Sequence, residues 1–290
     1  MTLALQAFVG GIAIGAVYSL IALGYTMIFS TTRVLNFAQG EFLMIGALVG
    51  WTLSVAWSLP LWIVVATLVV VLGVVGVITE RLVMIPVRLA GSSFAWIIAT
   101  LAVSIVWRNL MGFLYGWEYY RFPPLAAGSF RLGPAVVDGQ QVVIVVAAIV
   151  LMIANELFMR RTFFGRAVRA TAYSHDIAAL MGIPVPLVVS ASFVFSAILT
   201  GLGGILIAPV IFADAHMGLI LGLKGFVAVI VGGMGSPRGA ILGGMLIGLL
   251  DTFVRSIVPS ELGNVIVFSI LALVLLVRPH GLVGSPAHGH

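Results

Sequence analysis

Two long stretches of this chain carry no charged side chain: residues 1–32 and residues 42–79. An apolar α-helix of about 20 residues is long enough to cross the hydrocarbon core of a bilayer. Soluble domains have about a quarter of their residues charged, whereas only 8% are charged here. The sequence therefore predicts an all-α, polytopic transmembrane helical bundle with some broken helices, and it excludes a soluble domain.

The apolar runs predict about eight membrane-entering segments in a single transmembrane domain, residues 1–283, followed by a flexible tail, residues 284–290. Arg108 is expected to interrupt the fourth span late, and to snorkel to the interface in preference to lining a polar interior. The expected spans are residues 3–29, two crossings within 42–79, then 94–115, 142–158, 187–212, an interrupted hairpin at 226–250 made of pieces too short to cross alone, and 263–277.

The loop charges predict an orientation in the membrane. Loops 80–92 and 159–186 are rich in arginine, and basic residues favour the cytoplasmic side. The loop at 116–141 is charge-neutral and would lie outside. This arrangement places the N-terminus outside and the C-terminus inside a bacterial-type plasma (inner) membrane. The net charge of +5 belongs mainly to the loops, so it sets orientation and does not indicate a nucleic-acid partner.

Two polar breaks interrupt apolar runs, at residues 31–41 and 232–239, and each follows a glycine-rich span. Paired interrupted helices in the two halves of a transporter point to a substrate pathway between the halves. Glu41 is expected to pair or to face water, with Arg33 as one possible partner. A structural ion pair, a helix cap or a plain hairpin turn explains these residues about equally well. The candidate pathway residues are Asn36, Phe37, Gln39, Glu41, Gly232, Gly233, Gly235 and Ser236.

The charged loop at 160–186 is predicted to form a compact amphipathic element. One short helix is expected from Gly165 to Ala172, and Ser174 can cap a second one with Asp176 in its first turn. Gly182 suits the end of that helix. A basic loop lying on anionic lipid is the alternative interpretation. An apolar stripe at helical spacing is formed by Ala170, Tyr173, Ile177, Leu180 and Met181.

The sequence offers no motif for chemistry of its own. The phosphate-binding pattern G-x-x-x-x-G-K-[ST] does not occur, so any ATP hydrolysis must come from a partner. No convergent nucleophile or acid–base set is evident, and an enzyme is not expected. Asp214, His216 and Lys224 are expected to mark a short, solvated polar turn, with neither a metal nor catalysis. There is no cysteine to bind a metal through a thiolate.

Three segments occur in order along the chain: Thr32–Phe42, the run from Gly165 to Gly182, and Lys224–Ala240. Together they resemble the signatures of the permeases of high-affinity branched-chain amino acid ABC importers, most closely the shorter of the two paired permeases. The resemblance covers roughly residues 5 to 283. The family usually has Asp at position 174 and often His at position 39. Ser174 keeps the capping role, whereas Gln39 cannot titrate.

The resemblance implies a permease subunit that moves branched-chain or related small amino acids, driven by ATP bound to partner subunits, with no cofactor of its own. The implied partners are a second permease subunit, homologous or identical, two cytoplasmic ABC ATPase subunits and a periplasmic or extracellular solute-binding protein. The ATPases would contact Gly165, Arg166, Arg169, Ala170, Ser174, Asp176, Leu180 and Gly182.

Two alternatives stay open. The first is the same architecture for another small solute, such as a sugar, a urea-like amide or an aromatic acid. The second, less favoured, is a secondary transporter. Such a transporter should carry titratable residues within its spans, and Glu41 and Arg108 are the only plausible ones.

Overall fold

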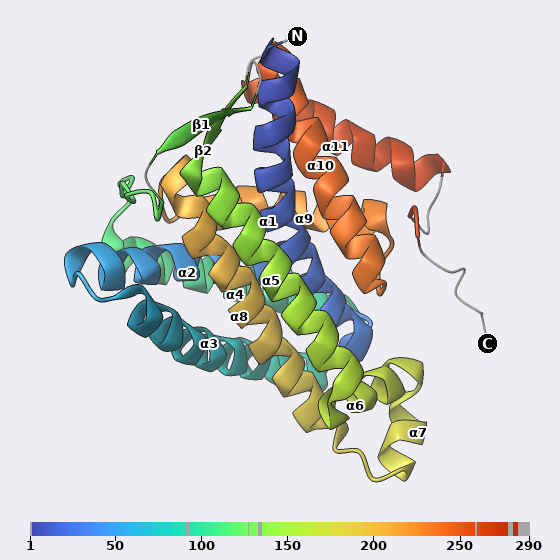
Figure 1. The fold of residues 1–290 in the computed structure, drawn as a ribbon. Helices are drawn as coiled ribbons and strands as arrows, with labels where there is room; N and C mark the ends of the chain where they lie inside the picture. The colour runs from blue at the N-terminus through green and yellow to red at the C-terminus, as the bar shows by residue number, and fades with distance from the viewer. Residues whose placement is uncertain are drawn as a thin grey trace.

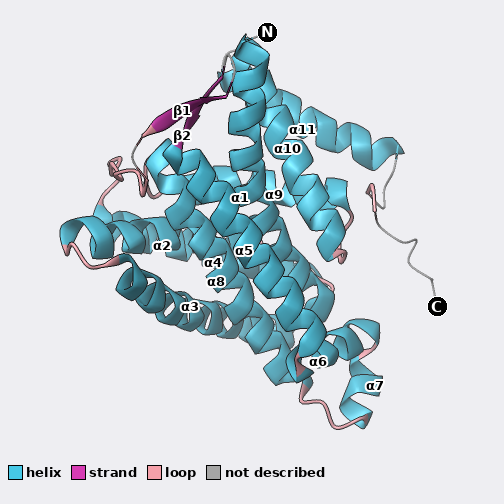
Figure 2. Cartoon of the chain, viewed as in Figure 1, coloured by secondary structure: helices cyan, strands magenta, loops and turns pink. Residues whose placement is uncertain are grey.

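A computed structural model describes residues 2–90, 93–126, 128–132, 135–258, 260–277 and 281–283. Nearly all of the described chain is helical (Figure 2), which confirms the predicted all-α transmembrane bundle. The helices are α1 (Thr2–Thr32), α2 (Gln39–Trp51), α3 (Leu61–Ala90), α4 (Ser93–Tyr115), α5 (Gly139–Arg161), α6 (Phe163–Tyr173), α7 (His175–Leu180), α8 (Val185–Ile211), α9 (Met217–Gly232), α10 (Pro237–Ile257) and α11 (Ser260–Val277).

Within the described residues, seven helical segments are long and apolar enough to cross a membrane, and α9 is a shorter apolar helix. One of the seven is α2, which continues into a π-helical turn at Thr52–Ala56. The interrupted hairpin expected at 226–250 is present, but the predicted bounds of its two helices are wrong. The structure has two separate helices there, of 16 and 21 residues, because polar residues assigned to loops lie inside α9 and α10.

The two ends of the bundle differ in structure (Figure 1). A small hairpin of β1 (Ser129–Leu132) and β2 (Ala135–Asp138), with Ser129 opposite Asp138, lies beside the start of α1. Gln6 Nε2 donates a hydrogen bond to the Val136 carbonyl at 2.9 Å and fixes that contact. The helices α6 and α7 project from the opposite end. The chain thus has a hairpin end and an α6–α7 end.

The bundle contains an internal repeat in which the second half runs in the opposite direction. The long helices α1 and α8 are each followed directly by a residue in the left-handed region, Arg33 (φ 57°) and Phe212 (φ 65°). A short non-helical segment then leads to a shorter helix, α2 or α9. Helix α10 packs on α1 as α3 packs on α8. The counterpart of the 31–41 break is therefore 212–216, and the sequence-based pairing with 232–239 is wrong.

Glycines allow these helices to approach closely, as small residues do in membrane bundles. A Cβ added to Gly248 would lie 2.1 Å from the Gly15 Cα, so α1 and α10 touch backbone to backbone. A Cβ at Gly46 would lie 2.0 Å from the Gly201 carbonyl oxygen, in the contact of α2 with α8. Close packing around α1, α2 and α8 forms the main apolar core.

Candidate functional site

The N-terminal ends of the two short helices, α2 and α9, cross inside the bundle. A Cβ added to Gly40 would lie 2.0 Å from the Gly218 carbonyl oxygen and 2.8 Å from the Gly222 Cα, so only glycine fits there. Helix N-termini carry unpaired N–H groups and a partial positive charge. The crossing therefore brings two polar helix ends together in the protein interior.

Glu41 supplies a negative charge at this crossing. It is 1% exposed, and its Oε1 accepts hydrogen bonds from Arg108 Nη2 and Ser104 Oγ, each at 2.7 Å. Its Oε2 faces the start of α9, since a Cβ at Gly218 would lie 2.8 Å from that oxygen. The predicted pairing of Glu41 is confirmed, but its partner is Arg108.

Arg33 and Arg108 both lie elsewhere than the sequence suggested. The guanidinium of Arg33 contacts the Ala172 carbonyl in α6, while Arg108 lies within an unbroken α4 and points into the bundle. Snorkelling of Arg108 is therefore wrong: pairing with a buried carboxylate offsets part of the cost of removing the guanidinium from water.

The other residues of the first predicted pathway set lie around the same crossing. Gln39 is fully buried, and its Nε2 donates to Thr200 Oγ1 at 2.6 Å and to Ser196 Oγ at 2.8 Å, both on α8. Asn36 Oδ1 accepts from the Ala38 N–H at 3.1 Å and closes a local turn before α2. Phe37 packs on Phe226 of α9, with ring centroids 5.7 Å apart. These contacts order the break between α1 and α2.

The second predicted pathway set lies in the turn between α9 and α10, at the other end of α9. From Gly218 to Gly232 the helix runs about 21 Å at 1.5 Å per residue, so the two sets are not brought together. Ser236 Oγ caps α10 by accepting from the Gly239 N–H at 3.1 Å, and Gly233 and Gly235 have φ of 108° and 81°. The contacts of this turn are those of a tight helix–helix connection.

A buried charge cluster that sequence reasoning missed links α1, α9 and α10. Lys224 Nζ lies 2.8 Å from both oxygens of Asp251, Tyr18 OH donates to Asp251 Oδ2 at 2.8 Å, and Arg255 Nε donates to Oδ1 at 3.0 Å. Lys224 and Asp251 are each 1% exposed. Asp214 is also buried while His216 is exposed, so the expectation of a solvated polar turn is wrong for Asp214 and Lys224 and holds for His216. The spacing of 27 residues between Lys224 and Asp251 shows no helical periodicity that could have revealed the pair.

The charged loop folds as two short helices, as predicted. Helix α6 begins at Phe163 with Thr162 Oγ1 accepting from the Gly165 N–H at 3.2 Å. Ser174 Oγ accepts from the Ile177 N–H at 3.3 Å and caps α7, with Asp176 in its first turn. Gly182 follows α7 with φ of 79°, a left-handed conformation that favours glycine.

One face of α6–α7 is packed against the bundle and the other is exposed. Helix α6 packs on α1, α5 and α8 through small buried residues such as Ala167 and Val168. A Cβ at Gly165 would lie 1.8 Å from the Met159 carbonyl oxygen, so glycine allows this packing. The predicted apolar stripe is largely exposed: Tyr173 is 82%, Ile177 49%, Leu180 88% and Met181 71% exposed, with Ala170 half-buried.

Three polar contacts hold α6–α7 to the bundle. His175 Nε2 lies 2.7 Å from the Thr31 carbonyl oxygen, and Arg33 contacts the Ala172 carbonyl. Arg169 Nη1 donates a hydrogen bond to the Met159 carbonyl oxygen at 2.6 Å, so this arginine links α6 to the end of α5. Arg166 is exposed, with its guanidinium 5.8 Å from the Phe163 ring centroid. The first two contacts tie α6–α7 to the end of α1.

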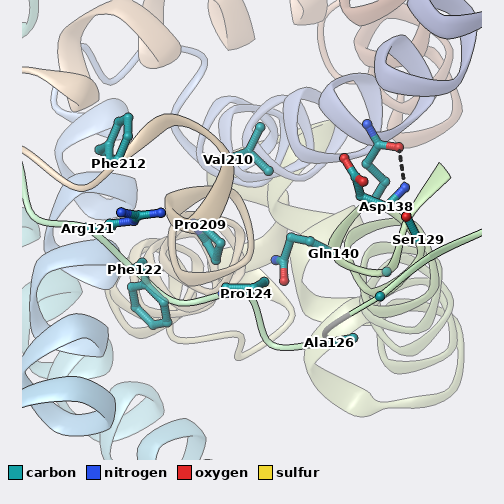
Figure 3. Close-up of a pocket in the computed structure, with 13 residues that line it drawn as sticks. Arg121, Phe122, Pro124, Ala126, Ser129, Asp138, Gln140, Pro209, Val210 and Phe212 are labelled. Atoms are coloured by element: carbon teal, nitrogen blue, oxygen red, sulfur yellow. Dashed lines mark hydrogen bonds between the residues drawn. The ribbon is translucent and has the colours of Figure 1, made fainter. Parts of the chain in front are cut away.

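A cavity of about 570 Å³ opens at the hairpin end (Figure 3). Gln140 joins the loop between α4 and β1 to α8. Its Oε1 accepts a hydrogen bond from the Leu125 N–H at 2.8 Å, and its Nε2 donates one to the Leu206 carbonyl at 2.9 Å. Arg121 and Phe212 line the same space. Among the described residues, no group of three or more His, Cys, Asp or Glu side chains could hold a metal ion.

Comparison with known proteins identifies the family. Residues 7–277 match the family model described as branched-chain amino acid transport system / permease component. The high-affinity branched-chain amino acid transport system permease protein LivH of Escherichia coli is 32% identical, covering 97% of this chain and 96% of that protein. The corresponding protein BraD of Pseudomonas aeruginosa is 32% identical, with the same coverage of 97% and 96%.

A solved structure, PsaBC from Streptococcus pneumoniae in complex with Fab, shares the fold with a TM-score of 0.51 and 14% identity, over 95% of this chain and 91% of that one. The seven helical segments of membrane-spanning length found in the described residues are consistent with these matches. The chain therefore belongs to the family of branched-chain amino acid transport system permease components.

Proposed function

We propose that this permease is the transmembrane subunit of an ATP-driven ABC importer in the inner membrane, and that it moves branched-chain or related small amino acids. The α6–α7 element is its contact with the cytoplasmic ATPase subunits, of which the assembled importer has two. A second permease subunit completes the membrane core, and an external solute-binding protein delivers the solute. The relatives in Escherichia coli and Pseudomonas aeruginosa, which carry the name of branched-chain amino acid transport permeases, support the choice of solute.

The observation that supports the proposal most directly is the exposed apolar surface of α6–α7, formed by Tyr173, Ile177, Leu180 and Met181. These exposed side chains lie on two short helices that project from one end of the bundle (Figure 1), and the other face of α6 is packed. A lipid-facing surface would belong on the flank of the long helices. A projecting apolar patch on an element that also exposes Arg166 and Arg169 is typical of a surface that binds another protein.

The contacts of this element suggest how force would pass to the bundle. Arg33 and His175 join α6–α7 to the last turn of α1, directly before the break that leads to α2. A movement of the ATPases would therefore act on the α1 end and on the α2–α9 crossing behind it. Hydrolysis itself belongs to the ATPases.

The arginine-rich α6–α7 end suits the cytoplasmic side. This orientation leaves the hairpin end, with its cavity near Gln140, on the outside, where a solute-binding protein would dock. It also places the start of α1 outside. Labelling of single cysteines, one at Ser129 and one at Asp176, from each side of sealed vesicles would test this orientation.

The docking role is tested by co-purification with the ATPase subunits and by the ATPase activity of the assembled importer. Leu180→Asp should abolish co-purification, because it places a charge in an apolar contact. Ile257→Asp is the matched control, since Ile257 is 80% exposed at the opposite end of α10 from the α9–α10 turn. Normal assembly and stimulated hydrolysis with Leu180→Asp would contradict the docking role.

A further inference from the structure

The charge cluster of α1, α9 and α10 borders a cavity of about 280 Å³, at the small end of ligand sites. We propose that this cavity binds the solute in transit, and that it takes an aliphatic α-amino acid in its zwitterionic form. The inference rests on the proposed transport function and assigns residues to it. Aliphatic walls are provided by Ile14, Ile207, Ile211, Met217, Ile220 and Leu221.

The cluster holds a surplus of positive charge. Asp251 already accepts four hydrogen bonds, two from Lys224, one from Arg255 and one from Tyr18. A carboxylate has about four acceptor sites, so Asp251 is saturated. One carboxylate thus faces two cations. Arg255 Nη2 makes only a long contact, 3.4 Å, with Asn264 Oδ1, so its guanidinium retains donors toward the cavity. A carboxylate is the ligand that these donors suit best.

A second carboxylate lines the same cavity. Asp214 Oδ1 accepts from the His216 N–H at 2.6 Å, which leaves its other oxygen to accept from an ammonium group. The charges of Lys224, Arg255, Asp251 and Asp214 sum to zero, so the bound solute should be neutral overall. A zwitterion meets this condition: its carboxylate would face Arg255 and Lys224, and its ammonium would face Asp214.

The side chain of the solute would then lie against the aliphatic walls. The six aliphatic residues of the cavity suit a branched apolar side chain better than the hydroxyl groups of a sugar, which would remain unpaired against them. His216 stacks on Trp117, with ring centroids 4.8 Å apart. Because His216 lines the cavity, Trp117 fluorescence offers a reporter of binding.

Binding of radiolabelled L-leucine to the purified importer, without the binding protein, tests the site. We expect competition by L-isoleucine, while 4-methylpentanoate, which lacks the ammonium, and 3-methylbutylamine, which lacks the carboxylate, should bind at least about tenfold more weakly. Glucose should not compete. Equal competition by all four compounds would overturn the zwitterion assignment.

The residues are tested by Arg255→Gln and Asp214→Asn, each of which should weaken leucine binding and raise the KM for ATP-driven leucine uptake by about tenfold or more. Arg255→Lys, which keeps the charge but loses the planar fork, should be intermediate. Arg81→Gln, a mostly exposed arginine of α3, is the control and should behave as wild type. Size-exclusion profiles identify any variant that fails to assemble.

Two failures are distinguishable. Leucine uptake by the wild type together with unchanged uptake by Arg255→Gln and Asp214→Asn would overturn this site and leave the transport function standing. A wild-type importer that takes up no amino acid would overturn the proposed function itself.

Discussion

At the α2–α9 crossing the charged side chains are buried and paired, whereas in α6–α7 both the arginines and the large apolar side chains face outward. Glu41 Oε1 accepts hydrogen bonds from Arg108 and Ser104 inside the bundle, whereas Glu41 Oε2 and Arg108 Nε are buried without a hydrogen-bond partner among the described residues. Tyr173 and Leu180 have most of their surface exposed. The ion pair of the crossing forms within one chain, while in our proposal the α6–α7 surface is covered by a partner subunit. Substitutions in the two regions should therefore separate loss of folding from loss of assembly.

The largest effect is expected for Glu41→Ala. It leaves the Arg108 guanidinium unpaired beside the α2–α9 crossing, and removal of one partner of a buried ion pair costs about 3–5 kcal/mol. Thermal unfolding of the purified permease should show a large fall in Tm. The double variant Glu41→Gln/Arg108→Met removes both charges and should recover part of the loss. An unchanged Tm for Glu41→Ala would mean that the pair does not stabilise the crossing.

Gly40→Ala should be the next most damaging. Its Cβ would lie 2.0 Å from the Gly218 carbonyl oxygen, and overpacking of a close contact costs about 1–3 kcal/mol. Gly10→Ala is a matched control, because its Cβ would lie 3.6 Å from the nearest atom, an ordinary contact. Comparison of the two Tm values isolates steric crowding from the general effect of replacing glycine. Equal Tm values would argue against a tight crossing.

Ser174→Ala should have a smaller and local effect. It removes the Oγ that caps α7, and loss of such a cap costs about 1 kcal/mol. Amide hydrogen exchange should accelerate in the first turn of α7 while the exchange of α1 and α8 stays unchanged. Ser174→Asp retains an acceptor and should keep the wild-type exchange rates. Protection that survives in Ser174→Ala would show that the cap is dispensable.

Leu180→Ser should change the stability least of all, by no more than about 0.5 kcal/mol, because the side chain is 88% exposed and has few contacts to lose. Co-purification with the ATPase subunits should nevertheless fall. This combination of unchanged Tm and weakened assembly is what separates α6–α7 from the crossing. A large fall in Tm would mean that α6–α7 supports the fold instead.

Local patterns predicted the fold class and the shape of α6–α7 well. The Ser174 cap and the left-handed Gly182 depend on neighbouring residues alone, and the sequence predicted both. The cap at Thr162 is equally local, but it was not among the predictions. The helix bounds around Lys224 and Asp251 were wrong, because charged residues usually mark loops. Lys224 in α9 and Asp251 in α10 neutralise each other although they are 27 residues apart, which allows each of them to lie inside a helix.

The sequence by itself determined that this chain is a membrane-spanning helical bundle, since long runs without charge can be buried only in lipid or in one another. It also determined that Ser174 caps α7 and that Gly182 follows its end. Only the tertiary structure decided that Glu41 pairs with Arg108, 67 residues away, and that the break at 212–216 matches the break before α2. The physical reason is that hydrogen-bond and charge energies depend on distances between helices, and those distances are set by how the glycines of α1, α2, α8, α9 and α10 let the backbones meet.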